Sequence, residues 1–122
     1  MHTVAFFQGF ARDAADAGMT DDEVDDLVNY LSENPTAGVE IPGTGGCRKL
    51  RFAKQGKGKR EGYRMVTFYS GKQLPVFLVT VFSKGEKSDL SKSECNELRV
   101  MTKVLVNEYK RKVATLATKK GA

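Results

Sequence analysis

Histidine, cysteine and tryptophan are scarce or missing in this chain of 122 residues, which has one histidine (His2), two cysteines and no tryptophan. Cys47 and Cys95 lie far apart and match no metal-binding spacing, and the histidine that a zinc site would add lies near the terminus. The same scarcity argues against a Ser/His/Asp triad. We therefore expect no metal and no cofactor. Two reduced thiols are favoured over one disulfide.

Long apolar stretches are also missing. No run approaches the roughly 20 residues that a membrane-spanning helix needs, and no basic segment followed by an apolar one marks the N-terminus. The length is typical of one domain with one modest core. The sequence thus predicts a single cytoplasmic domain over residues 1–122, in which residues 117–122 form a frayed tail.

Positive charge is nearly absent from the first third of the chain. Residues 1–42 hold one cation, Arg12, and nine acids, whereas residues 43–122 hold 19 cations and six acids. The two parts carry net charges of −8 and +13, which together give the overall +5. A field as positive as that of the second part attracts phosphates, so nucleic acid is the leading partner and an anionic membrane the second. The alternative is that the lysines are only solvated surface charge.

Three helices are predicted from apolar spacing and capping signals. Residues 6–18 place four apolar side chains on one side, and Gly18 ends that helix. Thr20 and Glu23 form a capping box before residues 21–33, and Ser91 and Glu94 form another before the last helix. The inner positions expected in the three helices are Phe6, Phe7, Phe10 and Ala14, then Val24, Leu27, Val28 and Leu31, then Leu98, Met101, Leu105 and Tyr109.

Strands are predicted where the apolar period changes to two. In residues 48–52, Leu50 and Phe52 face one way and Lys49 and Arg51 the other. Residues 62–70 and 75–83 follow as a hairpin, the second being apolar on both faces as a central strand should be. Residues 2–6 form a possible first strand, and residues 36–46 read as a loop. The predicted class is α+β, with helices on one sheet face and a cationic groove on the other.

Two loops could carry chemistry. The segment "KQGKGKREGYR" (residues 54–64) combines cations with glycines but lacks the spacing of a phosphate-cradling P-loop, so its glycines are better explained as letting lysines approach a polyanion. The segment "FSKGEKSDL" places Lys84, Glu86 and Lys87 where a strand ends, which suggests acid–base chemistry. A salt-bridged solvent loop is the alternative. Tyr63 and Tyr69 could stack on unpaired bases or belong to the core.

These segments resemble a known family. The stretches "IPGTGGCRKLRFAKQGKGKREGYRMVTFY" and "PVFLVTVFSKGEKSDLS" are similar to the RelE/ParE superfamily of bacterial toxins, in particular its HigB-like branch, and the resemblance covers nearly the whole chain. It implies a RelE-like fold, with a small twisted antiparallel sheet, two N-terminal helices and a C-terminal helix. It also implies a toxin of a type II toxin–antitoxin system.

The activity implied by the resemblance is that of an mRNA interferase, a metal-independent endoribonuclease that cleaves mRNA in the ribosomal A site. Its partners would be the ribosome, mRNA and a cognate antitoxin with a helix-turn-helix DNA-binding domain. A surface with a net charge of +13 should attract an acidic partner segment. The alternative is a non-cleaving inhibitor, either of DNA gyrase, as in the ParE branch, or a relative that only binds nucleic acid.

Site residues carry over one by one. Arg64 matches the arginine that contacts the scissile phosphate in RelE-like toxins, and Lys49 and Arg51 match the strand cations beside it. Gly85 and Ser91 stand where RelE has an arginine and a tyrosine, so the identity of the general acid and base stays open between Glu86 and a lysine. Catalytic roles are expected for Lys84, Glu86 and Lys87. RNA-binding roles are expected for Lys57, Lys59, Arg60 and Tyr63. Lys57 and Lys59 could also take the place of Lys49 and Arg51 beside the scissile phosphate.

Overall fold

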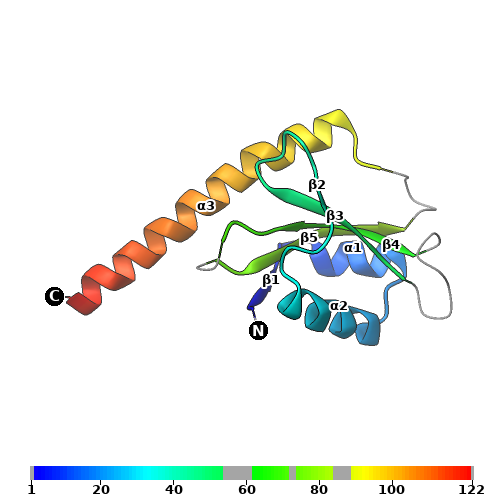
Figure 1. Cartoon of the computed structure of the whole chain (residues 1–122), viewed down its shortest axis with the longest axis horizontal. Coiled ribbons are helices and arrows are strands. Elements are labelled where there is room, and N and C mark those ends of the chain that lie inside the picture. The colour runs from blue at the N-terminus through cyan, green and yellow to red at the C-terminus, as the bar shows by residue number, and fades with distance from the viewer. Residues whose placement is uncertain (1, 54–61, 72–73, 84–88, 122) are drawn as a thin grey trace.

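The computed structural model describes residues 2–53, 62–71, 74–83 and 89–121, with side chains described as far as Lys110 (Figure 1). Its elements are β1 (Val4–Phe6), α1 (Phe10–Ala17), α2 (Asp21–Glu33), β2 (Val39–Glu40), β3 (Cys47–Phe52), β4 (Tyr63–Phe68), β5 (Val76–Ser83) and α3 (Lys92–Gly121). The strands form one five-stranded sheet in the order β1-β5-β4-β3-β2. β1 runs parallel to β5, and the other neighbours are antiparallel. The predicted α+β class is confirmed.

The first helix begins later than predicted. Phe6 ends β1, and the backbone N–H of Phe7 donates to the carbonyl of Leu78 at 2.9 Å, which continues the contact with β5. Gly9 has φ of 93°, a left-handed conformation that favours glycine, and α1 starts at the next residue. Pairing with β5 therefore outweighs the helical spacing of the phenylalanines. Gly18 ends α1, as predicted.

Both predicted capping boxes are confirmed. Thr20 Oγ1 accepts the N–H of Glu23 at 3.1 Å, and Glu23 Oε1 accepts the N–H of Thr20 at 3.0 Å. Ser91 and Glu94 make the same reciprocal pair at 3.1 and 2.9 Å ahead of α3. These side chains satisfy backbone donors that a helix start leaves without partners.

The strand at the centre of the sheet is β4, whose six residues are all buried. β5, predicted as the central strand, lies inside the sheet between β1 and β4. Residues 36–46 were predicted as a loop, but they contain β2, in which Val39 pairs with Lys49 of β3. Two exposed residues are too few to show an alternating pattern, so the sequence gives no sign of this edge strand.

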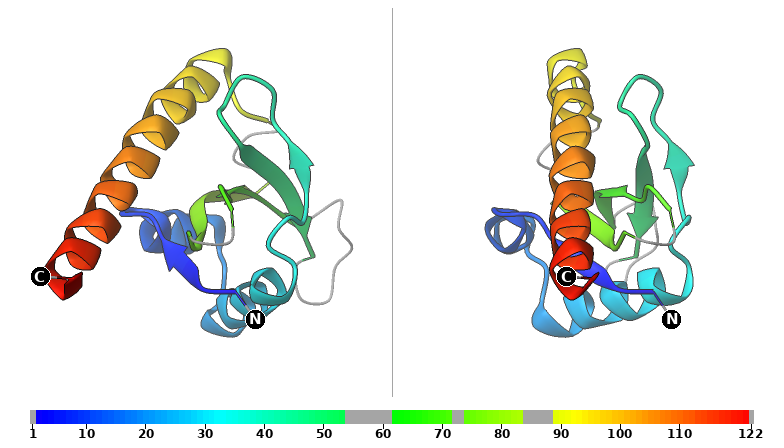
Figure 2. Two further views of the ribbon diagram at one scale, coloured as in Figure 1. Left: turned by 60° about the vertical axis from the view of Figure 1, so that its left-hand side comes forward. Right: turned by 90° about the vertical axis from the view of Figure 1, so that its left-hand side faces the viewer.

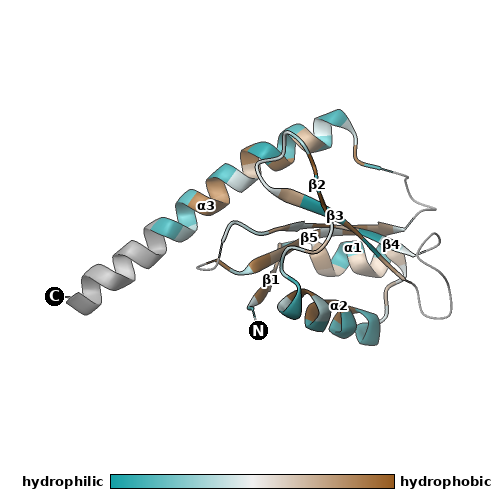
Figure 3. Cartoon of the chain, in the orientation of Figure 1, coloured by the Kyte–Doolittle hydropathy of each residue, from teal (hydrophilic) through white to brown (hydrophobic). Residues whose placement is uncertain are grey.

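Helices cover both faces of the sheet, which corrects the prediction of one covered face. In Figures 1 and 2, α1 and α2 lie on the opposite side of the sheet from α3. The first core, between α1, α2 and the sheet, consists of Phe10, Ala14, Ala17, Met19, Leu27, Leu31, Tyr63, Met65, Leu78 and Val81. The second, between α3 and the sheet, consists of Cys47, Val66, Phe68, Phe77, Val79 and Leu98, with Leu105 and Tyr109 packed against it. Figure 3 shows hydrophilic residues along much of α2.

α3 differs from its prediction at one inner position and at its end. Met101 is 37% exposed, whereas the next residue, Thr102, is 2% exposed, and its hydroxyl lies 3.0 Å from the carbonyl oxygen of Thr44. A threonine replaces the expected apolar contact because it can donate to a buried backbone carbonyl. The helix continues to Gly121, where a frayed tail was expected from residue 117. Among the described residues, no helix is long and apolar enough to cross a membrane.

Candidate nucleic-acid interface

Three cations share one face of β3 and β4. Arg51 of β3 and Arg64 of β4 are direct cross-strand partners, so their side chains leave the same face of the sheet. Lys49 lies two residues before Arg51 and therefore also faces that way. Leu50 and Phe52 alternate with them and pack against the first core. The predicted division of this strand into an apolar and a cationic face is confirmed.

Arg64 is held close to the backbone. Arg64 is only 7% exposed, and its Nη1 donates a hydrogen bond to the carbonyl oxygen of Gly62 at 3.4 Å. Glycine is required at position 62 because a Cβ there would lie 2.2 Å from the carbonyl oxygen of Phe52. This close approach of β3 and β4 fixes the backbone on which Arg64 stands. A guanidinium keeps its charge in such a setting and offers a planar fork to phosphate oxygens.

Lys49 makes an ion pair with an acid that sequence reasoning did not select. Lys49 Nζ lies 3.0 and 3.1 Å from the two carboxylate oxygens of Asp89, three residues before α3. The hydrogen bond from Lys49 lowers the pKa of Asp89, as does the N–H of Leu90, and the charge of Arg64 adds to the effect. A carboxylate therefore stands among the cations of this face and remains ionised at neutral pH.

Tyr63 is part of the core, so the expectation that it stacks on an RNA base is wrong. It is 1% exposed, and its hydroxyl lies 2.8 Å from Glu23 Oε1 and 3.2 Å from the carbonyl oxygen of Gly18. Burial, followed by the hydrogen bond to the Glu23 carboxylate, raises the pKa of Tyr63 to about 12. Because side chains alternate along β4, Tyr63 ties the strand to α2 while its neighbour Arg64 faces the opposite side.

The sequence matches the family described as "RelE toxin of RelE / RelB toxin-antitoxin system" over residues 4–121. The chain belongs to the RelE toxin family. The resemblance found in the motifs is thus confirmed at family level, and the chain is a toxin of a toxin–antitoxin system that pairs with an antitoxin. Membership of the HigB-like branch stays a prediction.

In this toxin, the two loops expected to hold the remaining site residues lie outside the part that the structure describes. They contain Lys57, Lys59, Arg60, Lys84, Glu86 and Lys87, whose expected roles stay predictions. The strand ends that flank them are described. Phe52 of β3 pairs with Tyr63 of β4, which in turn pairs with Ser83 of β5. The chain therefore enters and leaves the first loop, and enters the second loop, at the same end of the sheet. Arg51 and Arg64 lie one residue from that end.

Asp89 is the described residue of the toxin's cationic face that sequence reasoning missed. The only feature of the sequence that could have pointed to Asp89 was its position, two residues before the capping residue Ser91 and two after the candidate Lys87. The contact with Lys49, however, spans 40 residues of sequence and depends on how α3 is set against β3. Neither charge nor spacing along the chain indicates such a pair.

Proposed function

We propose that this toxin is a metal-independent endoribonuclease that cleaves mRNA in the ribosomal A site and so arrests translation in the cytoplasm. The observation that carries the proposal is the clustering of Lys49, Arg51 and Arg64 on one face of β3 and β4. Cations in such a row suit a phosphodiester backbone. Family membership supports a toxin whose activity is held back by its antitoxin.

The proposed reaction is attack by a ribose 2′-hydroxyl on its own neighbouring phosphate. The new P–O bond closes a cyclic phosphate, and the bond to the 5′-oxygen of the next nucleotide breaks. A base takes the proton of the 2′-hydroxyl, and an acid gives a proton to the leaving 5′-oxygen. Negative charge builds on the non-bridging oxygens meanwhile, and a fixed guanidinium stabilises it. Arg64, with its restrained side chain, is proposed for that role.

Asp89 is better suited to electrostatics than to proton transfer. A general base works best when its pKa lies near the operating pH, whereas the Lys49 contact lowers the pKa of Asp89 below its ordinary value. Glu86 and the lysines Lys84 and Lys87 therefore remain the candidates for acid and base. Lys57, Lys59 and Arg60 are proposed to hold ribosomal RNA or the flanking message.

Primer extension on messages from cells that express the toxin alone tests the proposal. New 5′ ends inside reading frames are expected within minutes of induction, together with a fall in amino-acid incorporation. If incorporation stops without new ends, the toxin binds without cutting. If DNA synthesis falls first while protein synthesis continues, inhibition of gyrase replaces the proposal.

A further inference from the structure

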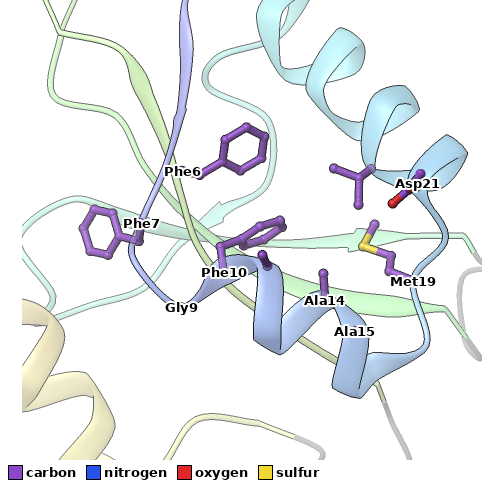
Figure 4. A pocket seen from close by; sticks show the side chains of 10 residues that line it. Phe6, Phe7, Gly9, Phe10, Ala14, Ala15, Met19 and Asp21 are labelled. Carbon is purple, nitrogen blue, oxygen red and sulfur yellow. The ribbon is translucent and has the colours of Figure 1, made fainter.

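An apolar pocket opens between β1, α1 and the start of α2, on the side of the sheet away from the cationic face (Figure 4). Its volume is about 420 Å³, and its lining includes Phe6, Phe10, Ala14, Met19 and Val24. The rings of Phe6 and Phe10 lie 5.4 Å apart between centroids, and Phe6 is 51% exposed. A half-exposed phenylalanine beside an open apolar pocket is typical of a surface that a partner covers.

The surroundings of this pocket are acidic. Asp21 lines it, and Asp16, Asp22 and Asp25 stand exposed on α1 and α2. Acids in the first turn of α2 also complement the helix dipole, which accounts for their presence without any ligand. Their field acts on a partner all the same, because residues 1–42 carry a net charge of −8 with Arg12 as the single cation. RNA is repelled here, and a cationic protein segment is attracted.

The toxin therefore presents two surfaces of opposite charge on opposite sides of one sheet. Phe10, Ala14 and Met19 of the pocket belong to the core on the α1 and α2 side. Lys49 and Arg51 face the side on which α3 packs. A protein bound in the pocket would leave the cationic face uncovered, so the two surfaces can serve different partners.

We infer that this pocket anchors the antitoxin, which inserts one large apolar side chain between Phe6, Phe10 and Val24 and places lysine or arginine residues beside Asp21 and Asp22. The inference rests on the pairing with an antitoxin and names the surface and chemistry of that contact. Net charge alone would predict a different contact, in which an acidic antitoxin segment covers Lys49 and Arg51. Under the proposed function, binding in the pocket would neutralise the toxin by its bulk, because the complex would be too large for the ribosomal A site.

Two pocket variants and one matched control test the inference. Phe6→Ser removes the exposed ring, and Asp21→Lys reverses the charge at the rim. Val39→Ser is the control, because Val39 is also an exposed apolar residue, at 72%, but lies on β2 at the other edge of the sheet. Each toxin is purified and titrated with the purified product of the gene next to its own. Thermal unfolding first establishes that each variant is folded.

We expect Phe6→Ser and Asp21→Lys each to weaken binding at least tenfold, with Val39→Ser unchanged. In cells, the two pocket variants should still arrest growth alone but escape rescue by the neighbouring protein. The inference is overturned if folded pocket variants bind as tightly as wild type, if Lys49→Glu and Arg51→Glu abolish binding instead, or if the neighbouring protein does not bind the wild-type toxin. Failure of the proposed ribonuclease activity would be seen separately. In that case the wild-type toxin would leave messages intact but would still bind the neighbouring protein.

Discussion

Arg51 and Arg64 face each other across the β3–β4 ladder with paired Cα atoms, so two guanidinium groups leave the same face of the sheet from adjacent strands. Like charges placed directly opposite each other destabilise a sheet. Such an arrangement is stabilised by an anion between the two groups. Under the proposed function, that anion is a phosphate of the RNA.

Replacement of Arg51, the exposed member of this pair, should separate the effect on stability from the effect on RNA binding. Arg51→Thr should raise the free energy of unfolding by about 0.5 kcal/mol, because it removes like-charge repulsion and adds a β-branched residue. The same variant should bind RNA more weakly, with a shallower salt dependence. Urea denaturation and filter binding measure the two quantities. Arg48→Thr, on the other face of β3, is the charge-matched control, and equal effects from both variants would contradict the assignment of Arg51.

Arg64 should matter for the rate of cleavage more than for binding. Arg64→Ala should lower the single-turnover cleavage rate on programmed ribosomes about a hundredfold, which is the scale for loss of one charge-stabilising contact. Arg64→Lys should restore only part of the rate, because a point charge does not reproduce the bidentate fork. Since Arg64 is 7% exposed, thermal unfolding of both variants must accompany the assay. A folded Arg64→Ala toxin that cuts at the wild-type rate would move the search to Lys84, Glu86 and Lys87.

Under the proposed function, Asp89 competes with RNA phosphates for Lys49. Asp89→Asn should tighten RNA binding at low salt, because Lys49 is then available to the nucleic acid. The slope of log Kobs against log salt should become steeper by about 0.7 for one added contact to single-stranded RNA. Stability should change little, since exposed ion pairs contribute about 0–1 kcal/mol. A variant with unchanged affinity and a reduced cleavage rate would instead assign Asp89 to the reaction.

Tyr63→Phe should affect stability and leave RNA binding intact. The variant loses a buried hydrogen bond to a carboxylate, at a cost of about 1–3 kcal/mol. Folding raises the pKa of Tyr63 from 10 to about 12, so its contribution is complete below pH 10 and is lost as the pH rises through 12. The stability difference between wild type and variant should shrink across that window. Tyr69→Phe, at a partly exposed tyrosine, serves as the control.

The two thiols should react at different rates. Cys47 is 0% exposed, and burial raises its pKa to about 11, whereas Cys95 at the start of α3 is partly exposed. Native toxin at pH 8 should therefore take up one equivalent of iodoacetamide quickly, and denatured toxin two. Peptide mapping by mass spectrometry identifies the modified residue. Rapid labelling of Cys47 in the native protein would contradict its placement in the second core.

Features that depend on neighbours in the sequence were predictable. The capping boxes of α2 and α3 join residues three apart, and the alternation of Leu50 and Phe52 with Lys49 and Arg51 follows from strand geometry alone. The cationic face could therefore be placed on β3 before any fold was known.

Features that depend on distant contacts were not predictable. Tyr63 stands next to a cationic loop and so looked like a base-stacking residue, but its partner Glu23 lies 40 residues earlier in the chain. Lys49 and Asp89 are also 40 residues apart. The late start of α1 has the same origin, because it follows from the pairing of the first strand with β5.

The pairing of β1 with β5 also determines when the sheet of the toxin can be completed during synthesis. Val4 of β1 lies beside Val76 of β5, and His2 Nε2 donates a hydrogen bond to the carbonyl oxygen of Leu74 across 72 residues of sequence. Contacts of such long range form slowly, because the entropy of closing a long loop has to be overcome first. A nascent chain that has not yet reached β5 lacks both the partner of β1 and one flank of β4, on which Arg64 stands. We therefore expect premature termination before Val76 to yield a fragment with an incomplete sheet and no toxicity, even though Lys49, Arg51 and Arg64 are all present in it.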